Sequence, residues 1–168
     1  MIEDEDLLLA VLNSAPVVEG RQSEALTGES WIEFTARFGG TGSPGEREEI
    51  RQVRDMLHQV IRGGADAVER LAELLEDVVL VPQVSAHGIH WALSTHPDRR
   101  ILARAVMAWS GILRDAPGRL RPCANDECNL FLIDRSRPGT ARWCSMATCG
   151  NRMKARAHAS RQARTAST

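Results

Sequence analysis

The stretch that decides how this chain is organised is residues 123–162, CANDECNLFLIDRSRPGTARWCSMATCGNRMKARAHASRQ. It contains all four cysteines of a 168-residue chain, and no acidic residue follows Asp134. Residues 1–134 carry 13 Lys and Arg against 22 Asp and Glu, whereas residues 135–168 carry eight Lys and Arg and no acid. A formal net charge of −1 thus combines an acidic part of −9 with a basic tail of +8. Such segregation suggests an arm that binds nucleic acid, or an internal contact between acidic part and basic tail.

The four cysteines form two pairs with the same internal spacing. Four residues separate Cys123 from Cys128 and Cys144 from Cys149, and fifteen residues lie between the pairs. Tetrahedral Zn²⁺ held by four thiolates needs two such pairs and a loop that brings them together. Four thiolates leave no open position for catalysis, so the spacing predicts one structural zinc ion. The alternative is four buried, inert cysteines that happen to cluster.

The residues around the cysteines predict a small fold that depends on the metal. Residues 129–134, NLFLID, lie between turn-forming segments and can form one strand of a β-hairpin beside the zinc. Ser145 can cap a helix that begins near Met146, which places Cys149 in its first turns, where the helix dipole favours thiolates. The segment has few apolar residues, so zinc binding is expected to supply most of its folding energy.

Ahead of this stretch the sequence predicts a mainly α domain with one small β-hairpin. Residues 3–12 fit a short helix or a strand, and apolar residues recur at helical spacing in segments 29–38, 43–61, 65–76 and 95–115. Ser43, Pro44 and Glu46 are the start signals of one of these helices. Residues 78–94 instead contain a β-branched run and a proline, followed by Ile89, Trp91 and Leu93 at period two, which predicts a small hairpin. The expected division is a helical regulatory domain over 1–116 and a four-cysteine zinc ribbon with a basic helix over 117–168, with a hinge at 116–122.

The basic tail is the candidate nucleic-acid contact. A helix over 146–164 would carry basic residues among Ala and Ser, which allows close approach to a groove. The candidate contacts are Arg135, Arg137, Arg142, Asn151, Arg152, Lys154, Arg156, Arg161 and Arg164. Asn151 is better explained by a hydrogen bond to a ligand sulfur or by a turn cap, and Arg142 and Arg152 can offset the charge of the zinc–thiolate centre. Asp134 is expected to hold the ribbon turn or to pair with Arg142.

The pattern C-x4-C-x2-F-x2-DRSR followed by RWCSMATCGNRMKAR resembles the CGNR zinc finger, named for the tetrapeptide at residues 149–152. The preceding residues resemble the ABATE domain, a helical domain of stress-induced transcription regulators, through LLLAVLNS near the start, the helix around Trp31 and the helices over 43–61 and 97–113. This resemblance implies a DNA-binding transcription regulator, although related zinc ribbons bind RNA.

Other side chains predict no catalytic site. His87 and His90 lack a third metal ligand nearby, so they are expected to be ordinary surface or core histidines, and His58 is expected to be exposed. Trp31, Trp91 and Trp109 can line an effector pocket, but tryptophans at such positions more often belong to the core. The sequence has no Ser–His–Asp or Cys–His arrangement and no phosphate-binding GxxxxGK loop. The protein is therefore not expected to be an enzyme.

Location and partners follow from the same observations. The N-terminus, MIEDEDLLLAVLNSA, has acids where a secretory signal has bases, and no apolar stretch approaches the ~20 residues of a membrane span. A cytoplasmic protein with no membrane contact is expected. Its expected partners are duplex DNA, a second copy in a homodimer and an unknown small-molecule effector. An RNA-binding ribbon and a protein-interaction adaptor that uses the basic tail are the alternatives.

Overall fold

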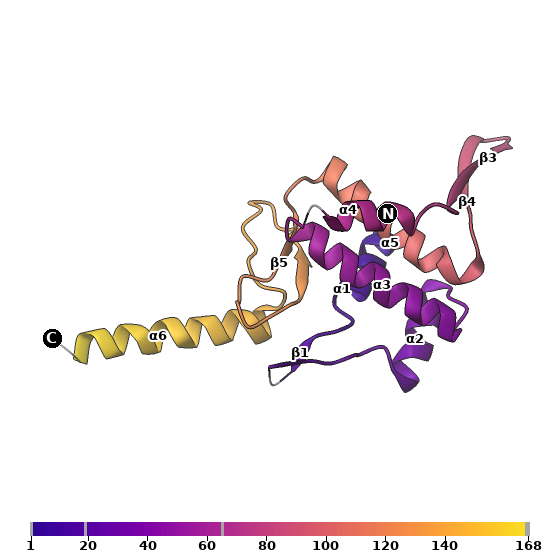
Figure 1. Ribbon diagram of the computed structural model, residues 1–168. Helices are drawn as coiled ribbons and strands as arrows, with labels where there is room; N and C mark the ends of the chain where they lie inside the picture. The colour runs from indigo at the N-terminus through magenta and orange to yellow at the C-terminus, as the bar shows by residue number, and fades with distance from the viewer. Residues whose placement is uncertain (1, 19, 65, 167–168) are drawn as a thin grey trace.

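The computed structural model describes residues 2–18, 20–64 and 66–166, with side chains over 4–18, 20–64 and 66–162. Within these ranges the chain forms six α-helices and three two-stranded antiparallel sheets (Figure 1). The predicted mainly α class is confirmed. No helix of the described residues is long and apolar enough to cross a membrane.

The helical body is built from α1 (Ile2–Leu12), α2 (Gly28–Phe38), α3 (Pro44–Ile61), α4 (Asp66–Glu73) and α5 (Arg100–Asp115), with a 3₁₀ turn, η1 (Pro97–Arg99), before α5. Helices α1, α3 and α5 pack together around one core, to which α2 contributes its three aromatic side chains. Leu7, Leu8 and Leu12 of α1 are fully buried, which explains why the opening segment is so apolar. The ambiguous residues 3–12 are therefore a helix enclosed by its neighbours.

The start of α3 confirms the predicted capping signals. Ser43 Oγ accepts a hydrogen bond from the Glu46 backbone N–H at 2.9 Å, and Pro44 occupies the first turn. The buried Glu46 carboxylate in turn accepts from the Gly42 N–H at 2.8 Å and from the Thr41 hydroxyl at 3.2 Å. The first of these bonds satisfies a backbone N–H that the helix start leaves without an intrahelical partner, and the other two tie the preceding loop to the first turn.

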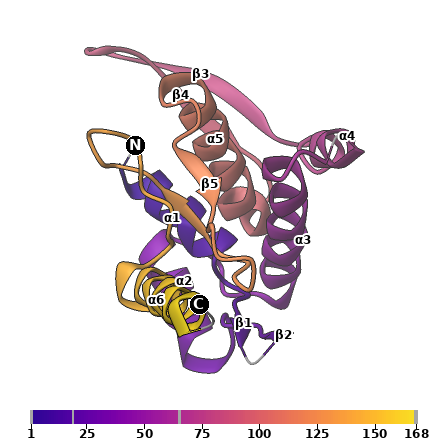
Figure 2. The ribbon, with the colours of Figure 1, turned by 90° about the vertical axis from the view of Figure 1, so that its left-hand side faces the viewer.

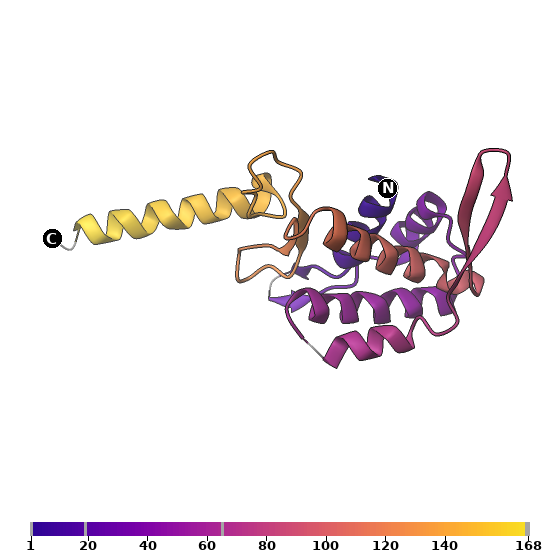
Figure 3. The same cartoon turned by 90° about the horizontal axis from the view of Figure 1, so that it is seen from above.

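Two of the small sheets lie outside the core. β1 (Val17–Val18) and β2 (Arg21–Gln22) form a short ribbon near the cysteine-containing end. β3 (Val79–Ser85) and β4 (Gly88–Ser94) form the predicted hairpin, which projects from the opposite end of the body (Figures 1 and 3).

The cysteine-containing part docks directly on the body. Strands β5 (Leu120–Pro122) and β6 (Phe131–Ile133) pair as the expected hairpin, and the Leu120 and Phe131 side chains are buried in the same core cluster as α1, α3 and α5. The Asn13 side chain brackets the Phe131 backbone, since its Nδ2 donates to the Phe131 carbonyl at 3.1 Å and its Oδ1 accepts from the Phe131 N–H at 2.8 Å. Residues 116–122, expected as a hinge, thus join two parts that share one core.

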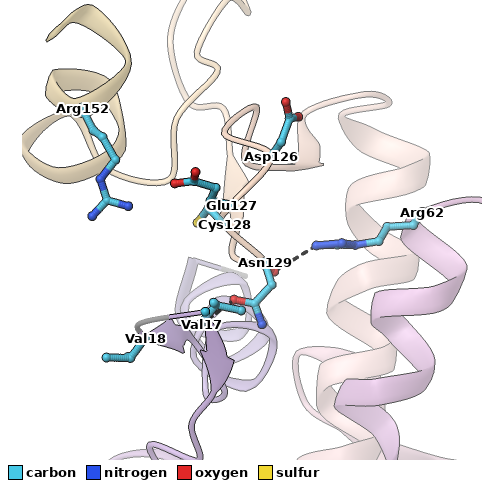
Figure 4. A pocket seen from close by; sticks show the side chains of 9 residues that line it. Val17, Val18, Arg62, Asp126, Glu127, Cys128, Asn129 and Arg152 are labelled. Carbon is cyan, nitrogen blue, oxygen red and sulfur yellow. Dashed lines mark hydrogen bonds between the residues drawn. The ribbon is translucent and has the colours of Figure 1, made fainter. Parts of the chain in front are cut away.

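Further contacts fix the same junction. Asn129 Oδ1 accepts from the Val17 N–H at 2.9 Å, and Asn129 Nδ2 donates to the Ala15 carbonyl at 2.7 Å. Arg62 donates to the Asn129 carbonyl at 3.0 Å (Figure 4). The prediction that His58 is exposed was wrong: its ring is half-buried, with its centroid 4.6 Å from that of Phe131. His58 is partly covered because β6 lies across this face of α3.

The last helix, α6 (Asn151–Ala166), leaves the cysteine-containing region and extends away from the body (Figure 1). In Figures 1 and 3 no other described element lies beside its outer length, and in Figure 2 the helix points toward the viewer. Its described side chains are exposed from Lys154 to Gln162.

Candidate metal centre

The four cysteines come together as predicted. Their Sγ atoms all lie within 4.8 Å of one another, and Cys144 Sγ lies 3.7 Å from both Cys128 Sγ and Cys149 Sγ. A tetrahedron of thiolates with Zn–S bonds of about 2.3 Å has edges of roughly 3.8 Å. All four are free cysteines rather than disulfides. The cluster therefore has the donor set and the size of a structural zinc site.

Each ligand pair is positioned by local structure. Cys123 directly follows β5 and Cys128 precedes β6, so the hairpin holds the first pair. Ser145 Oγ accepts from the Thr148 N–H at 3.3 Å and caps η2, a single π-helical turn over Met146–Gly150 that contains Cys149. The predicted strand and cap are both confirmed.

The space around residue 150 explains why a glycine occupies this position of the CGNR tetrapeptide. Gly150 is buried beside the metal site, and a Cβ built on it would lie 2.8 Å from Met146 Sδ and 3.2 Å from Trp143 Cδ1. A larger residue would push these side chains away from the turn that carries Cys149.

Asn125 supports the cluster, and sequence reasoning missed it. This side chain is fully buried; its Nδ2 donates to Cys149 Sγ at 3.5 Å and its Oδ1 accepts from the Glu127 N–H at 3.4 Å. The role considered for Asn151, a hydrogen bond to a ligand sulfur, is thus performed by Asn125. Asn151 is exposed and donates to the Ala147 carbonyl at 3.3 Å, which is the turn-capping role. The only local signal for Asn125 is its place between two ligands.

The thiols of this cluster do not all ionise readily without a metal. Burial raises the pKa of the Cys128 and Cys144 thiols, and neighbouring thiols raise that of Cys144 further. Burial also opposes ionisation of Cys149, but hydrogen bonds from Asn125 and the neighbouring thiols outweigh it and lower the pKa of Cys149. Zinc would supply the positive charge that draws off the remaining protons, which couples metal binding to the folding of this region.

Asp134 holds the ribbon turn, as predicted. Its buried carboxylate accepts from the Ser136 hydroxyl at 2.6 Å and from the backbone N–H groups of Ser136 and Ala141, both at 2.9 Å. The hydrogen bonds from Ser136 keep the pKa of Asp134 below its ordinary value. Its ion-pair partners are Arg121, at 3.0 Å, and Arg119, at 4.0 Å, whereas the Arg142 guanidinium lies over the Trp143 ring at 5.2 Å from the centroid. Of the two roles expected for Asp134, the structure therefore has the first, holding the ribbon turn, and not the pair with Arg142.

The predicted nucleic-acid contacts fall into two groups. Arg135 pairs with Glu5 at 3.1 Å and Asp6 at 3.0 Å, so it joins the zinc region to α1, and Arg156 pairs with Glu127. Arg137, Arg152 and Lys154 are exposed and have no ion-pair partner among the residues with described side chains. Arg161 is exposed on α6, whereas Arg164 lies outside the residues whose side chains are described.

A groove of about 1000 Å³ runs between the zinc region and the β1–β2 ribbon (Figure 4). It is wide and open, and its charges are mixed, since Arg62 and Arg152 lie on it together with Asp126 and Glu127. The three tryptophans considered for an effector pocket lie elsewhere: Trp31 is buried on α2, Trp109 is half-buried on α5 and Trp91 is exposed on β4.

Residues 119–162 match the family model of the CGNR zinc finger. The match encloses the four clustered cysteines and most of α6, and we call this segment the zinc finger below. No curated protein matches the chain. The zinc finger and its four-thiol cluster agree on one structural zinc ion, held by Cys123, Cys128, Cys144 and Cys149.

Proposed function

We propose that the protein is a zinc-dependent, DNA-binding transcriptional regulator in which the zinc finger presents α6 to duplex DNA. The observation that carries this proposal is the exposed, purely basic surface of α6. The helix extends away from the body (Figure 1), and no acidic residue occurs after Asp134. Arg152 and Lys154 have no ion-pair partner among the side chains described.

The composition of α6 suits a groove. Sixteen helical residues span about 24 Å, and most positions between the basic ones are Ala or Ser. Small side chains permit close approach to the duplex, while Arg and Lys reach phosphates, and Arg can also read guanine edges. The zinc cluster and its contacts to the body fix the start of the helix, so its direction of approach is set by the fold.

In this proposal, residues 1–116 form the regulatory domain. Their resemblance to the ABATE domain suggests a role in dimerisation or in sensing a small-molecule effector. The proposal includes no catalysis, because four thiolate ligands leave a zinc ion without an open coordination position.

Two alternatives use the same basic tail. An RNA-binding ribbon would stack unpaired bases on exposed aromatic side chains. Phe131 is buried and Trp143 is half-buried beneath Arg142, which favours duplex DNA. A protein-interaction adaptor would dock the tail on acidic groups. The ion pairs of Arg135 and Arg156 with acids of this chain favour that alternative for these two residues.

The test is binding of the zinc-loaded protein to mixed duplex DNA, single-stranded DNA and RNA across a salt series. The variant K154A/R161A, which changes two exposed positions of α6 beyond the cysteine cluster, should retain zinc and lose at least about tenfold in DNA affinity. The slope of its affinity against salt concentration should fall by the equivalent of about two phosphate contacts. The matched control is R37A/R114A, which removes the same charge from exposed positions on the body. It should stay within about twofold of wild type.

Equal loss in both double variants would mean that only net charge matters, and the proposal would fail. Tighter binding to single-stranded RNA than to duplex DNA would establish the first alternative. If the protein binds no nucleic acid even at low salt, the DNA-binding proposal fails and the protein-interaction adaptor is the alternative that remains.

A further inference from the structure

The β3–β4 hairpin is the least charged part of the molecule. Residues 79–94 contain no Asp, Glu, Lys or Arg, in a chain of which 26% of the residues are charged. The hairpin projects beyond the helices (Figure 3), and among the described strands each of its two strands pairs only with the other. An isolated two-stranded hairpin is at best marginally stable in water, so we expect another surface to pack against this one.

The strand register places apolar side chains together on one side. Opposite residues in an antiparallel pair share a face, and faces alternate along each strand. The pairs are Leu80↔Leu93, Pro82↔Trp91 and Val84↔Ile89. These six residues form what we call the apolar face. The other face carries Gln83 and His90, which are hydrogen-bonded at 2.8 Å, together with the smaller apolar residues Val79, Val81 and Ala92.

Most of the apolar face is open to solvent. Val84 is 82% exposed, Ile89 65%, Trp91 63% and Leu80 42%, whereas Leu93 packs partly against the core. Scattered apolar residues on a surface are ordinary, but a contiguous patch with a tryptophan at its centre marks a contact site. The last residues of α6 lie at the opposite end of the molecule (Figure 1), so this helix does not cover the patch.

We propose that the apolar face is a dimerisation surface, covered by the apolar face of a second copy of this chain. The inference makes specific the dimerisation assigned above to residues 1–116, and rests on the proposed function in that respect only. An uncharged surface offers nothing to nucleic acid or to a strongly charged protein, whereas two copies meet without like-charge repulsion.

The same surface is suited to pairing with itself. A twofold axis brings identical patches together, and Trp91 is the central residue of the seven-residue strand β4, so it can lie at the centre of the contact. Packing the two hairpins face to face, about 10 Å apart, would bury both apolar faces in a four-stranded sandwich. The free edge of β4 also has no proline and no charged residue, the features that prevent edge-to-edge strand pairing in monomeric proteins.

The test is the mass of the full-length, zinc-loaded protein in sedimentation, at chain concentrations up to about 100 μM, where a dimer with a Kd of about 10 μM would predominate. The wild type should be a dimer. Val84→Glu should weaken it at least about tenfold, because it places an unpaired carboxylate in an apolar contact. Val81→Glu is the matched control: the same change in the same strand, on the other face. It should stay within about threefold.

Circular dichroism and zinc content verify that each variant is folded, and the milder Ile89→Ser replaces Val84→Glu if the latter is not. A wild type that remains monomeric at the highest concentration overturns the inference, as does equal weakening by Val81→Glu. Because no nucleic acid is present, failure here is distinct from failure of DNA binding by α6.

Discussion

Two antiparallel hairpins of this molecule differ in burial: one is exposed to solvent, and the other is part of the hydrophobic core. The β3–β4 hairpin has seven residues in each strand, yet its apolar side chains face solvent. The β5–β6 hairpin has three residues in each strand, yet Phe131 is only 1% exposed. The short hairpin is held by the cysteine cluster at one end and by the body across its face. Strand length therefore does not decide which hairpin belongs to the core; what covers it does.

The strongest way to break the comparison is to remove zinc. Cys144→Ser, or a chelator, should abolish metal binding and unfold the β5–β6 hairpin. Because Leu120 and Phe131 are part of the body's core, the free energy of unfolding of the whole protein should also fall by at least several kcal/mol. Thermal melts followed by circular dichroism, with zinc content measured in parallel, test this. An unchanged melting temperature for the body would show that the zinc finger is an independent appendage.

The next comparison truncates one aromatic side chain in each hairpin. Phe131→Ala should lower the free energy of unfolding by about 3–5 kcal/mol because it leaves a cavity in the core. Trp91→Ala, measured at concentrations where the protein is monomeric, should change it by less than about 1 kcal/mol, since Trp91 is already exposed. Denaturant unfolding measures both. Equal effects would mean that β3–β4 contributes to the core as β5–β6 does.

A smaller effect is expected at the cluster's supporting amide. Asn125→Ala should weaken zinc affinity about 10–100-fold, because the Cys149 sulfur loses its buried hydrogen-bond donor. Asn151→Ala is the control, since that side chain is exposed and donates to the Ala147 carbonyl; it should retain nearly full affinity. Competition with a chromophoric chelator measures both. A greater loss in Asn151→Ala would restore the role first considered for it.

The smallest expected effect is a pH dependence that originates at the junction. Burial lowers the pKa of His58, while its Nε2–H donates to the Leu12 carbonyl at 2.7 Å. Between this lowered value and the ordinary value near 6.5, the unfolded chain binds more protons than the folded one. Stability from His58 is therefore full above about pH 6.5 and is lost as the pH falls below it.

The measurement for His58 is denaturant unfolding of wild type and His58→Gln between neutral and mildly acidic pH, with zinc retention checked at each point. The difference in unfolding free energy between the two proteins should shrink as the pH falls, because His58 of the wild type loses its contribution. Proton binding by the cysteines is common to both proteins and cancels in this difference. A difference that does not vary with pH would place the titration elsewhere.

Much of this arrangement was predictable because its signals are local. Cysteine spacing identified the cluster, Ser145 identified the cap before Cys149, and Ser43 with Glu46 identified the start of α3. The β-branched run and the period-two residues in 78–94 predicted a hairpin, and nothing in that pattern required it to be buried.

The rest depends on contacts between distant residues. The hydrogen bonds between Asn13 and Phe131 join positions 118 residues apart in the sequence, and neither residue belongs to a sequence motif that predicts them. His58 is covered by the same docking, and the Arg135 ion pairs with Glu5 and Asp6 also depend on it. Sequence reasoning treated Arg135 as one member of a basic tail because charge alone does not say which arginines the body engages.

The direction in which α6 extends gives the molecule an electric dipole moment. Charge of −9 is spread over residues 1–134 and +8 over residues 135–168, most of it on a helix that points away from the body (Figure 1). Near a polyanion such a molecule experiences a torque that turns α6 forward while the acidic body is repelled. Orientation is then partly selected before contact, which raises the productive fraction of encounters and makes the association rate fall steeply with ionic strength.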